Sequence, residues 1–158
     1  FFTVNGAGMG EKIQVAAKTK LRIHARAVSR TPLGRVEVVS NGEVLKSVHT
    51  REKEAVLDFE IAADSSRWFC LRVSATDSFD AITGPGIAHS SAIYAEIDGK
   101  SVLKSEDIRF WIDNLNIHRE RVRVLGRFAT DSQRQEALSF IDSGLAKYRS
   151  LLPEADNR

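Results

Sequence analysis

A length of 158 residues suffices for a sandwich domain of about 100 residues and an appendage, and the apolar content of 42% lies well above the disordered range. The 23 basic and 21 acidic side chains nearly cancel, so charge gives no reason to expect a nucleic-acid partner. No apolar run approaches the roughly 18 residues of a membrane helix, so no membrane insertion is expected. The single cysteine, Cys70, excludes an internal disulfide and is expected to be a buried, inert thiol.

Short alternating segments separated by turn residues extend from the start of the chain to about residue 104. In the segment 19–28, Leu21 and Ile23 share one face and Arg22 and His24 the other, which is the period of a half-buried strand. Strands at this spacing, without intervening helices, predict a mainly β fold, an antiparallel β-sandwich over residues 1–104. The expected strands are 10–16, 19–28, 35–39, 44–48, 55–61, 67–74 and 90–97.

Three turn signals organise these strands. Asn41-Gly42 favours a type I′ hairpin turn between two of them. Gly84-Pro85-Gly86 is expected to be a loop that leads into the last strand, and Asp98-Gly99 ends that strand.

The hydrophobic period then changes and predicts two helices, a C-terminal helical hairpin that forms one structural unit with the sandwich. Ser105 is expected to cap the first helix, and Gly126 interrupts it. Thr130 caps the second helix, and Pro153 ends it. The extension covers residues 105–158. The apolar stripes are Ile108, Trp111, Ile112, Leu115 and Val122 in the first helix, and Ala137, Leu138, Ile141, Leu145 and Tyr148 or Leu152 in the second.

One short segment contains residue types that a catalytic triad needs. His89, Ser90 and Ser91 bring a base and hydroxyl nucleophiles together in sequence. Adjacent strand residues point to opposite faces, and no Gly-x-Ser-x-Gly elbow accompanies them. We therefore expect these side chains to bond the loop backbone and assign no catalytic residue.

Metal binding finds little support. The four histidines are far apart, and none has a partner two or four residues away: His24, His49, His89 and His118. Asp77 and Asp80 flank a long loop with His89, where oxygen ligands could hold a weak calcium ion. The plainer interpretation is a polar loop with Asx turns. We assign no metal and no cofactor.

Two further motifs have plain explanations. The glycines of segment 6–10 lack the spacing and the following helix of a dinucleotide-binding loop, so they are expected to let the chain turn into the sandwich. The basic stretch 118–123 with Arg127 is interrupted by Glu120 and has no interleaved aromatic residues. It is therefore expected to be a solvated helix face.

The two tryptophans allow a second class of function. Trp68 and Trp111 could form a carbohydrate-binding platform, although core packing is the default for both. Trp68 lies beside Phe69 in one strand, so one of the two must face outward. Exposed aromatic residues gathered on one sheet face would favour a carbohydrate- or cell-surface-binding module.

Three segments occur in an order similar to that of a known module. They are Pro32-Leu33-Gly34-Arg35-Val36-Glu37-Val38-Val39-Ser40-Asn41-Gly42, Ser65-Ser66-Arg67-Trp68-Phe69-Cys70-Leu71-Arg72-Val73 and Ala88-His89-Ser90-Ser91-Ala92-Ile93-Tyr94-Ala95. Together they resemble the C-terminal immunoglobulin-like module of the CehA/McbA type of bacterial metallohydrolase. The resemblance covers about residues 1–115; alanine and serine stand where the family pattern has proline and threonine in the third segment.

The resemblance implies an immunoglobulin-like accessory domain with no chemistry of its own. The metal ligands of the implied PHP or amidohydrolase-type domain would lie upstream of Phe1, and the absence of an initiator Met predicts a piece of a longer polypeptide. The expected partners are that upstream catalytic domain and, in a homo-oligomer, further copies of the chain. The resemblance implies a bacterial protein. Its compartment stays open, because exported bacterial proteins and proteins of reducing compartments both fit a single cysteine.

Overall fold

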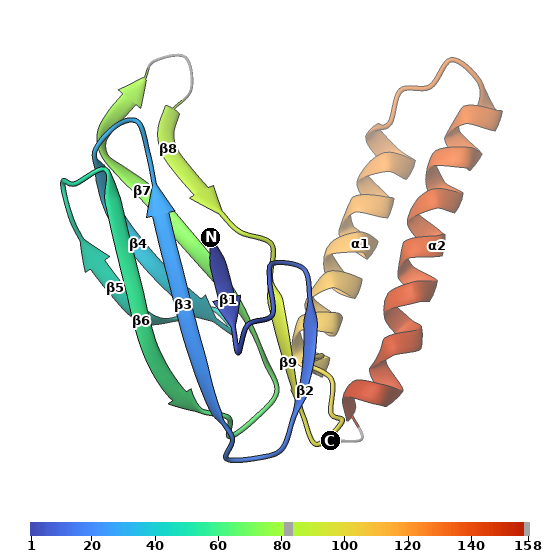
Figure 1. Cartoon of the computed structure of the whole chain (residues 1–158). Helices are drawn as coiled ribbons and strands as arrows, with labels where there is room; N and C mark the ends of the chain where they lie inside the picture. Colours follow the sequence, from blue (N-terminus) through green and yellow to red (C-terminus); the bar gives the residue numbers. More distant parts are fainter. Residues whose placement is uncertain (81–83, 157–158) are drawn as a thin grey trace. The chain divides into compact units, whose positions relative to one another are not determined.

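A computed structural model describes residues 1–80 and 84–156, with side chains for residues 1–75 and 86–155. The chain divides into two compact units, residues 1–102 and 103–158, and each is described by itself. The first unit consists of strands and the second of two helices (Figure 1). The prediction of a mainly β fold followed by a pair of helices is confirmed at this level. Within the described ranges, neither helix combines the length and apolar character needed to cross a membrane.

The strands of the first unit form two sheets. The small sheet has the order β1-β3-β6, built from Phe2–Val4, Lys20–Val28 and Glu54–Ala62. The larger sheet has the order β2-β9-β7-β4-β5, built from Lys12–Val15, Ile93–Ile97, Arg67–Asp80, Leu33–Ser40 and Glu43–His49. A further strand, β8 (Gly84–His89), pairs with β7.

The two sheets share one apolar core. Strand β3 alternates as expected, with Leu21, Ile23 and Ala25 fully buried between polar residues. They join Phe69 and Ile93 of the larger sheet in a single cluster. Because alternate residues of a strand share a face, each sheet turns one apolar face to the other and its polar face away, which is a β-sandwich.

One strand pair departs from the expected antiparallel arrangement. Strands β2 and β9 pair in parallel, with Lys12 opposite Tyr94 and Val15 opposite Ile97. The other strand pairs between described residues are antiparallel. About 80 residues separate β2 from β9, and the period of a sequence carries no information on the direction of so distant a pairing.

The prediction of a loop at Gly84-Pro85-Gly86 is wrong, because these are the first three residues of strand β8. Proline is tolerated there since β8 is an edge strand, whose outward backbone groups need no partner within the sheet. Strand β1 was also absent from the prediction: three residues are too few to show an alternating pattern.

The hairpin turn at Asn41-Gly42 is confirmed. The backbone φ angles are 49° at Asn41 and 90° at Gly42, the positive values that a type I′ turn requires at both positions. Strands β4 and β5 pair on either side of it, with a register shift between Val38 and Val39.

The second unit is an antiparallel pair of helices, α1 (Ser105–Leu125) and α2 (Asp131–Asp156). The expected cap at Ser105 is wrong: Lys104 occupies the N-cap position without a side-chain bond, and Ser105 is already helical. The cap at Thr130 is confirmed, since its Oγ1 accepts a hydrogen bond from the backbone N–H of Gln133.

Helix α2 does not end at Pro153, contrary to the prediction, but continues to Asp156. Proline removes one backbone donor, yet its fixed φ is close to the helical value, so the last turn keeps its dihedral angles.

Trp111 also differs from the expected core position: half of it is exposed, and it stacks on Tyr148 with ring centroids 6.4 Å apart.

Candidate functional site

His89, Ser90 and Ser91 lie at the junction between β8 and β9. The Ser90 Oγ accepts a hydrogen bond from the Leu71 N–H at 3.0 Å and donates one to the Ser91 carbonyl at 2.9 Å. The Ser90 N–H donates to the Leu71 carbonyl at 2.8 Å, and His89 Nδ1 lies 3.1 Å from the Ser90 carbonyl. The hydroxyl thus replaces a backbone acceptor where the strand is interrupted. These contacts support the structural interpretation of Ser90 over a nucleophilic one.

The histidines are not brought together. His24 lies 2.6 Å from Asp58, Arg35 Nε donates to His49 Nε2 at 3.2 Å, and His118 lies on the exposed surface of α1. Among the residues that the structure describes, no three His, Cys, Asp or Glu side chains are placed to hold a metal ion. The side chains of Asp77 and Asp80 lie outside the described residues.

The outer face of the small sheet is a ladder of ion pairs between β3 and β6. The Arg26 guanidinium, by hydrogen bonding and by its charge, lowers the pKa of Glu54 below its usual value. Exposed pairs of this kind contribute little to stability, because water and salt screen them. The ladder is therefore a solvated face; its ion pairs are Lys20–Glu60 and Arg26–Glu54, and His24 is hydrogen-bonded to Asp58.

The outer face of the larger sheet holds two buried carboxylates. Glu37 is 6% exposed and accepts hydrogen bonds from Arg72 at 2.7 and 2.8 Å. Glu96 is also 6% exposed; it lies 2.6 Å from Lys12 and accepts a hydrogen bond from Gln14. Each buried charge therefore has a cationic partner, which is what its burial requires.

Trp68 and Tyr94 face each other across β7 and β9 on the same outer face. Phe69 is fully buried in the core, so Trp68 is the one of the two neighbours that faces outward. Trp68 is half-buried and Tyr94 is 36% exposed. Cys70 lies two residues further along the same strand, and burial raises the pKa of its thiol, which disfavours the reactive thiolate.

The glycines of segment 6–10 form turns. Asn5 and Gly6 have φ angles of 49° and 83°, and Val4 and Ala7 exchange two backbone hydrogen bonds around them at 3.0 Å. Gly10, with φ of 88°, donates its N–H to the Ala92 carbonyl where β2 begins to follow β9. The segment leads from the small sheet into the larger one, in agreement with its expected turning role.

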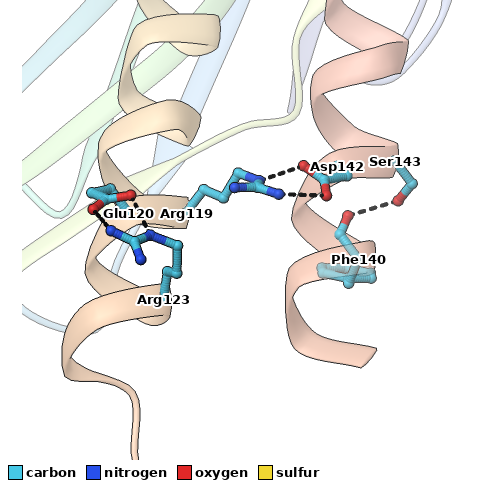
Figure 2. Close-up of polar contacts among 6 residues, drawn as sticks. All are labelled: Arg119, Glu120, Arg123, Phe140, Asp142 and Ser143. Atoms are coloured by element: carbon cyan, nitrogen blue, oxygen red, sulfur yellow. Dashed lines mark hydrogen bonds and ion pairs between the residues drawn. The ribbon is translucent and has the colours of Figure 1, made fainter. Parts of the chain in front are cut away.

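Two arginines of the basic stretch of α1, Arg119 and Arg123, are paired with carboxylates. Arg119 donates two hydrogen bonds to Asp142 of α2, at 2.6 and 3.1 Å, and Arg123 pairs with Glu120 on its own helix (Figure 2). The hydrogen bonds from Arg119 hold the pKa of Asp142 below its usual value. Figure 2 also shows the Ser143 hydroxyl donating to the Phe140 carbonyl within α2.

Helix α1 has apolar residues on two sides. Leu115 is half-buried, with its Cδ1 3.7 Å from the position of a Cβ built on Gly144 of α2. Phe110, Ile117 and Val124 recur every seven residues on another side and are 59%, 55% and 58% exposed. This second row is called the outer stripe below.

A groove of about 480 Å³ opens between the two sheets. Its lining combines core side chains, Leu33 and Leu71 among them, with residues 86–90 of β8 and its junction. Four large apolar side chains on its lining are more than half exposed: Phe1, Met9, Val28 and Ile87. Sequence reasoning missed this groove, because its walls come from strands whose pairing the sequence does not show.

No protein-family model matches the chain, and no curated protein matches it. Among solved structures, the chain is similar to one from work described as "Structures of Clostridium thermocellum CbhA fibronectin(III)-like modules". The two chains are 15% identical, the similarity covers 61% of this chain and 98% of the other, and the TM-score is 0.36. A similarity this weak assigns neither a family nor a function.

Proposed function

We propose that this chain is a non-catalytic, immunoglobulin-like accessory module of a larger metal-dependent hydrolase, and that α1 carries a contact with a partner domain. The strand order supports the fold assignment. The sheets β1-β3-β6 and β9-β7-β4-β5 follow the order of strands A-B-E and G-F-C-C′ of immunoglobulin-like sandwiches. The three segments that resemble the CehA/McbA-type module support the hydrolase association.

The outer stripe of α1 is the observation that carries the partner contact. Phe110, Ile117 and Val124 each lie two positions after a buried or half-buried residue of α1, which places them about 200° further around the helix. Those residues are Ile108, Leu115 and Val122. Full burial of such a side chain contributes roughly 1.5–3 kcal/mol, so leaving three in water forgoes a large stabilisation. An apolar row on the side of a helix away from its partner is typical of a protein contact surface.

The native gene product tests the proposal. Its mass and the sequence upstream of Phe1 are expected to reveal a domain with His and Asp metal-ligand motifs. In that full-length protein, Ile117→Lys is expected to lower the melting temperature and to expose the interdomain region to protease. Asn116→Lys, which adds the same charge at an exposed neighbour, is the matched control. A native product that begins near Phe1, or equal effects of both variants, contradicts the proposal.

A carbohydrate-binding module is the second candidate, and the pair Trp68–Tyr94 favours it. Two aromatic side chains directly opposite each other on an outer sheet face offer an apolar strip for a sugar ring, and Lys12 lies opposite Tyr94 on the neighbouring strand. Retardation of the protein in polysaccharide gels, lost in Tyr94→Ala and retained in Val56→Ala, would support it. Equal migration with and without every polysaccharide tested contradicts it.

A further inference from the structure

The open edge of β8 is the starting point. Strands β8 and β9 lie on the same side of β7, paired with its second and first halves. Strand β2 covers β9, with Lys12 opposite Tyr94, whereas β8 pairs with β7 alone among the described strands (Figure 1). The edge of the larger sheet is thus covered along one half and open along the other.

The backbone groups at this edge point outward. Because the Ser90 N–H bonds to the Leu71 carbonyl, residues at odd positions of β8 direct their N–H and C=O away from β7 by strand alternation. Of these residues, Pro85 has no N–H, whereas Ile87 and His89 carry both groups and are exposed. They offer two donors and two acceptors for a further strand.

The small sheet forms the other wall of the groove. Phe1 and Arg26 exchange hydrogen bonds at 2.8 and 2.9 Å in the β1–β3 pairing. Strand β3 continues to Val28, which also lines the groove. The groove therefore lies between the edge of β8 and the end of β3.

The groove is apolar, and its charges restrict what it accepts. Phe1, Met9, Val28 and Ile87 supply large exposed apolar surface, and a volume of about 480 Å³ lies within the range of roughly 300–1,000 Å³ typical of binding sites. Among the side chains that the structure describes, the lining contains no carboxylate, and its ionisable members are Arg26 and His89. A ligand lysine or arginine that faced Arg26 would meet like charge, whereas uncharged apolar side chains fit.

We infer that this groove accepts an extended polypeptide segment that adds as a strand to the free edge of β8 and places alternate uncharged, apolar side chains between the two sheets. The backbone groups of Ile87 and His89 supply the hydrogen bonds, and the groove supplies specificity, as in other strand-addition complexes. The surface is separate from the outer stripe of α1, so the inference stands independently of the proposed hydrolase association.

A labelled peptide of eight alternating valine and threonine residues, with a glutamate at each end, is the probe. Fluorescence anisotropy is expected to show saturable binding to the whole chain, at least tenfold weaker in Ile87→Lys. Val56→Lys, at an exposed apolar position on β6, is the matched control and should bind as the unmodified protein does. Circular dichroism establishes that both variants are folded.

Two N-methylated peptides separate strand addition from simple apolar contact. The N–H groups of all the valines point to one side of the strand and those of all the threonines to the other. Methylating one set should abolish binding while methylating the other leaves it nearly unchanged. Amide exchange at Ile87 and His89 should slow at least tenfold in the complex.

Four results overturn the inference: no binding at millimolar peptide, equal binding of both methylated peptides, equal weakening by Ile87→Lys and Val56→Lys, or a concentration-dependent dimer that Ile87→Lys abolishes. The last result would assign the edge to a second copy of the chain. None of them bears on the hydrolase association, which the native product and the α1 variants test separately.

Discussion

Neighbouring aromatic residues on β7 provide a sharp test of the sandwich register. Phe69 is fully buried between the sheets, whereas Trp68 lies on the opposite face across from Tyr94. Replacing a buried phenylalanine by alanine costs about 3–5 kcal/mol, because apolar burial is lost and a cavity remains. Trp68 is half-buried on a sheet face and leaves no closed cavity when it is removed, so its replacement by alanine costs less, roughly 1–2 kcal/mol. We therefore expect Phe69→Ala to be the far more damaging change, although tryptophan is the larger side chain.

Urea unfolding followed by circular dichroism measures the difference, with amide exchange of β3 to assign the transition to the sandwich. With a slope of roughly 1.5 kcal/mol per molar urea, Phe69→Ala should lower the midpoint by about 2–3 M and Trp68→Ala by about 0.7–1.3 M. Phe140→Ala, at a position 81% exposed on α2, is the neutral control. A loss for Trp68→Ala equal to that for Phe69→Ala would refute the register, since a shift of one residue exchanges the two faces.

Three further predictions concern the helical hairpin. Thr130→Ala should destabilise α2 by about 1 kcal/mol in thermal unfolding at 222 nm, and Thr130→Ser should not, because serine keeps the capping hydroxyl. Gly144→Ala should stabilise the hairpin by up to about 1 kcal/mol, because alanine favours the helix and the added methyl group meets its nearest atom at an ordinary contact distance of 3.7 Å. Gly126→Ala should destabilise the hairpin, because the methyl group would lie 2.3 Å from the Val122 carbonyl oxygen. The lowered pKa of Asp142 means that its pair with Arg119 stabilises the fold above the unfolded pKa of about 3.9 and that this contribution is lost as pH falls through the folded pKa. Asp142→Asn should therefore lower the melting temperature at pH 7, with a difference that shrinks in 1 M salt and vanishes in acid; a pH-independent difference contradicts the ion-pair explanation.

The elements that the sequence predicted well depend on near neighbours. Asn41-Gly42 sets its own turn type, because both residues accept positive φ values. The strict alternation of apolar and polar residues in β3 predicts which face is buried. Thr130 caps α2 by a hydrogen bond with Gln133, only three residues away. Each of these features is decided by residues within one strand or one helical turn.

The features that the sequence did not reveal depend on distant pairing or on position in the sheet. The residues of β8 read as a loop because glycine and proline disfavour central strands, but an edge strand removes that objection. Strands β2 and β9 are about 80 residues apart in the sequence. Their pairing, which determines the half of the larger sheet's edge that stays open, therefore cannot be predicted from local patterns. The sequence predicted Ser90 within the last strand and His89 in the loop before it, whereas His89 ends β8 and Ser90 lies between β8 and β9. The groove next to these residues depends on both sheets.

The glycine segment 6–10 connects these observations. Strand β1 belongs to the small sheet and β2 to the larger one, so the chain must cross between sheets within a few residues. Gly10 allows this at a φ of 88°, and its bond to the Ala92 carbonyl starts β2 beside β9 rather than beside β8. The crossing therefore has two consequences: it leaves the β8 edge open, and it brings Met9 onto the lining of the groove. A segment that resembled a nucleotide-binding loop instead sets where the sandwich remains able to accept another strand.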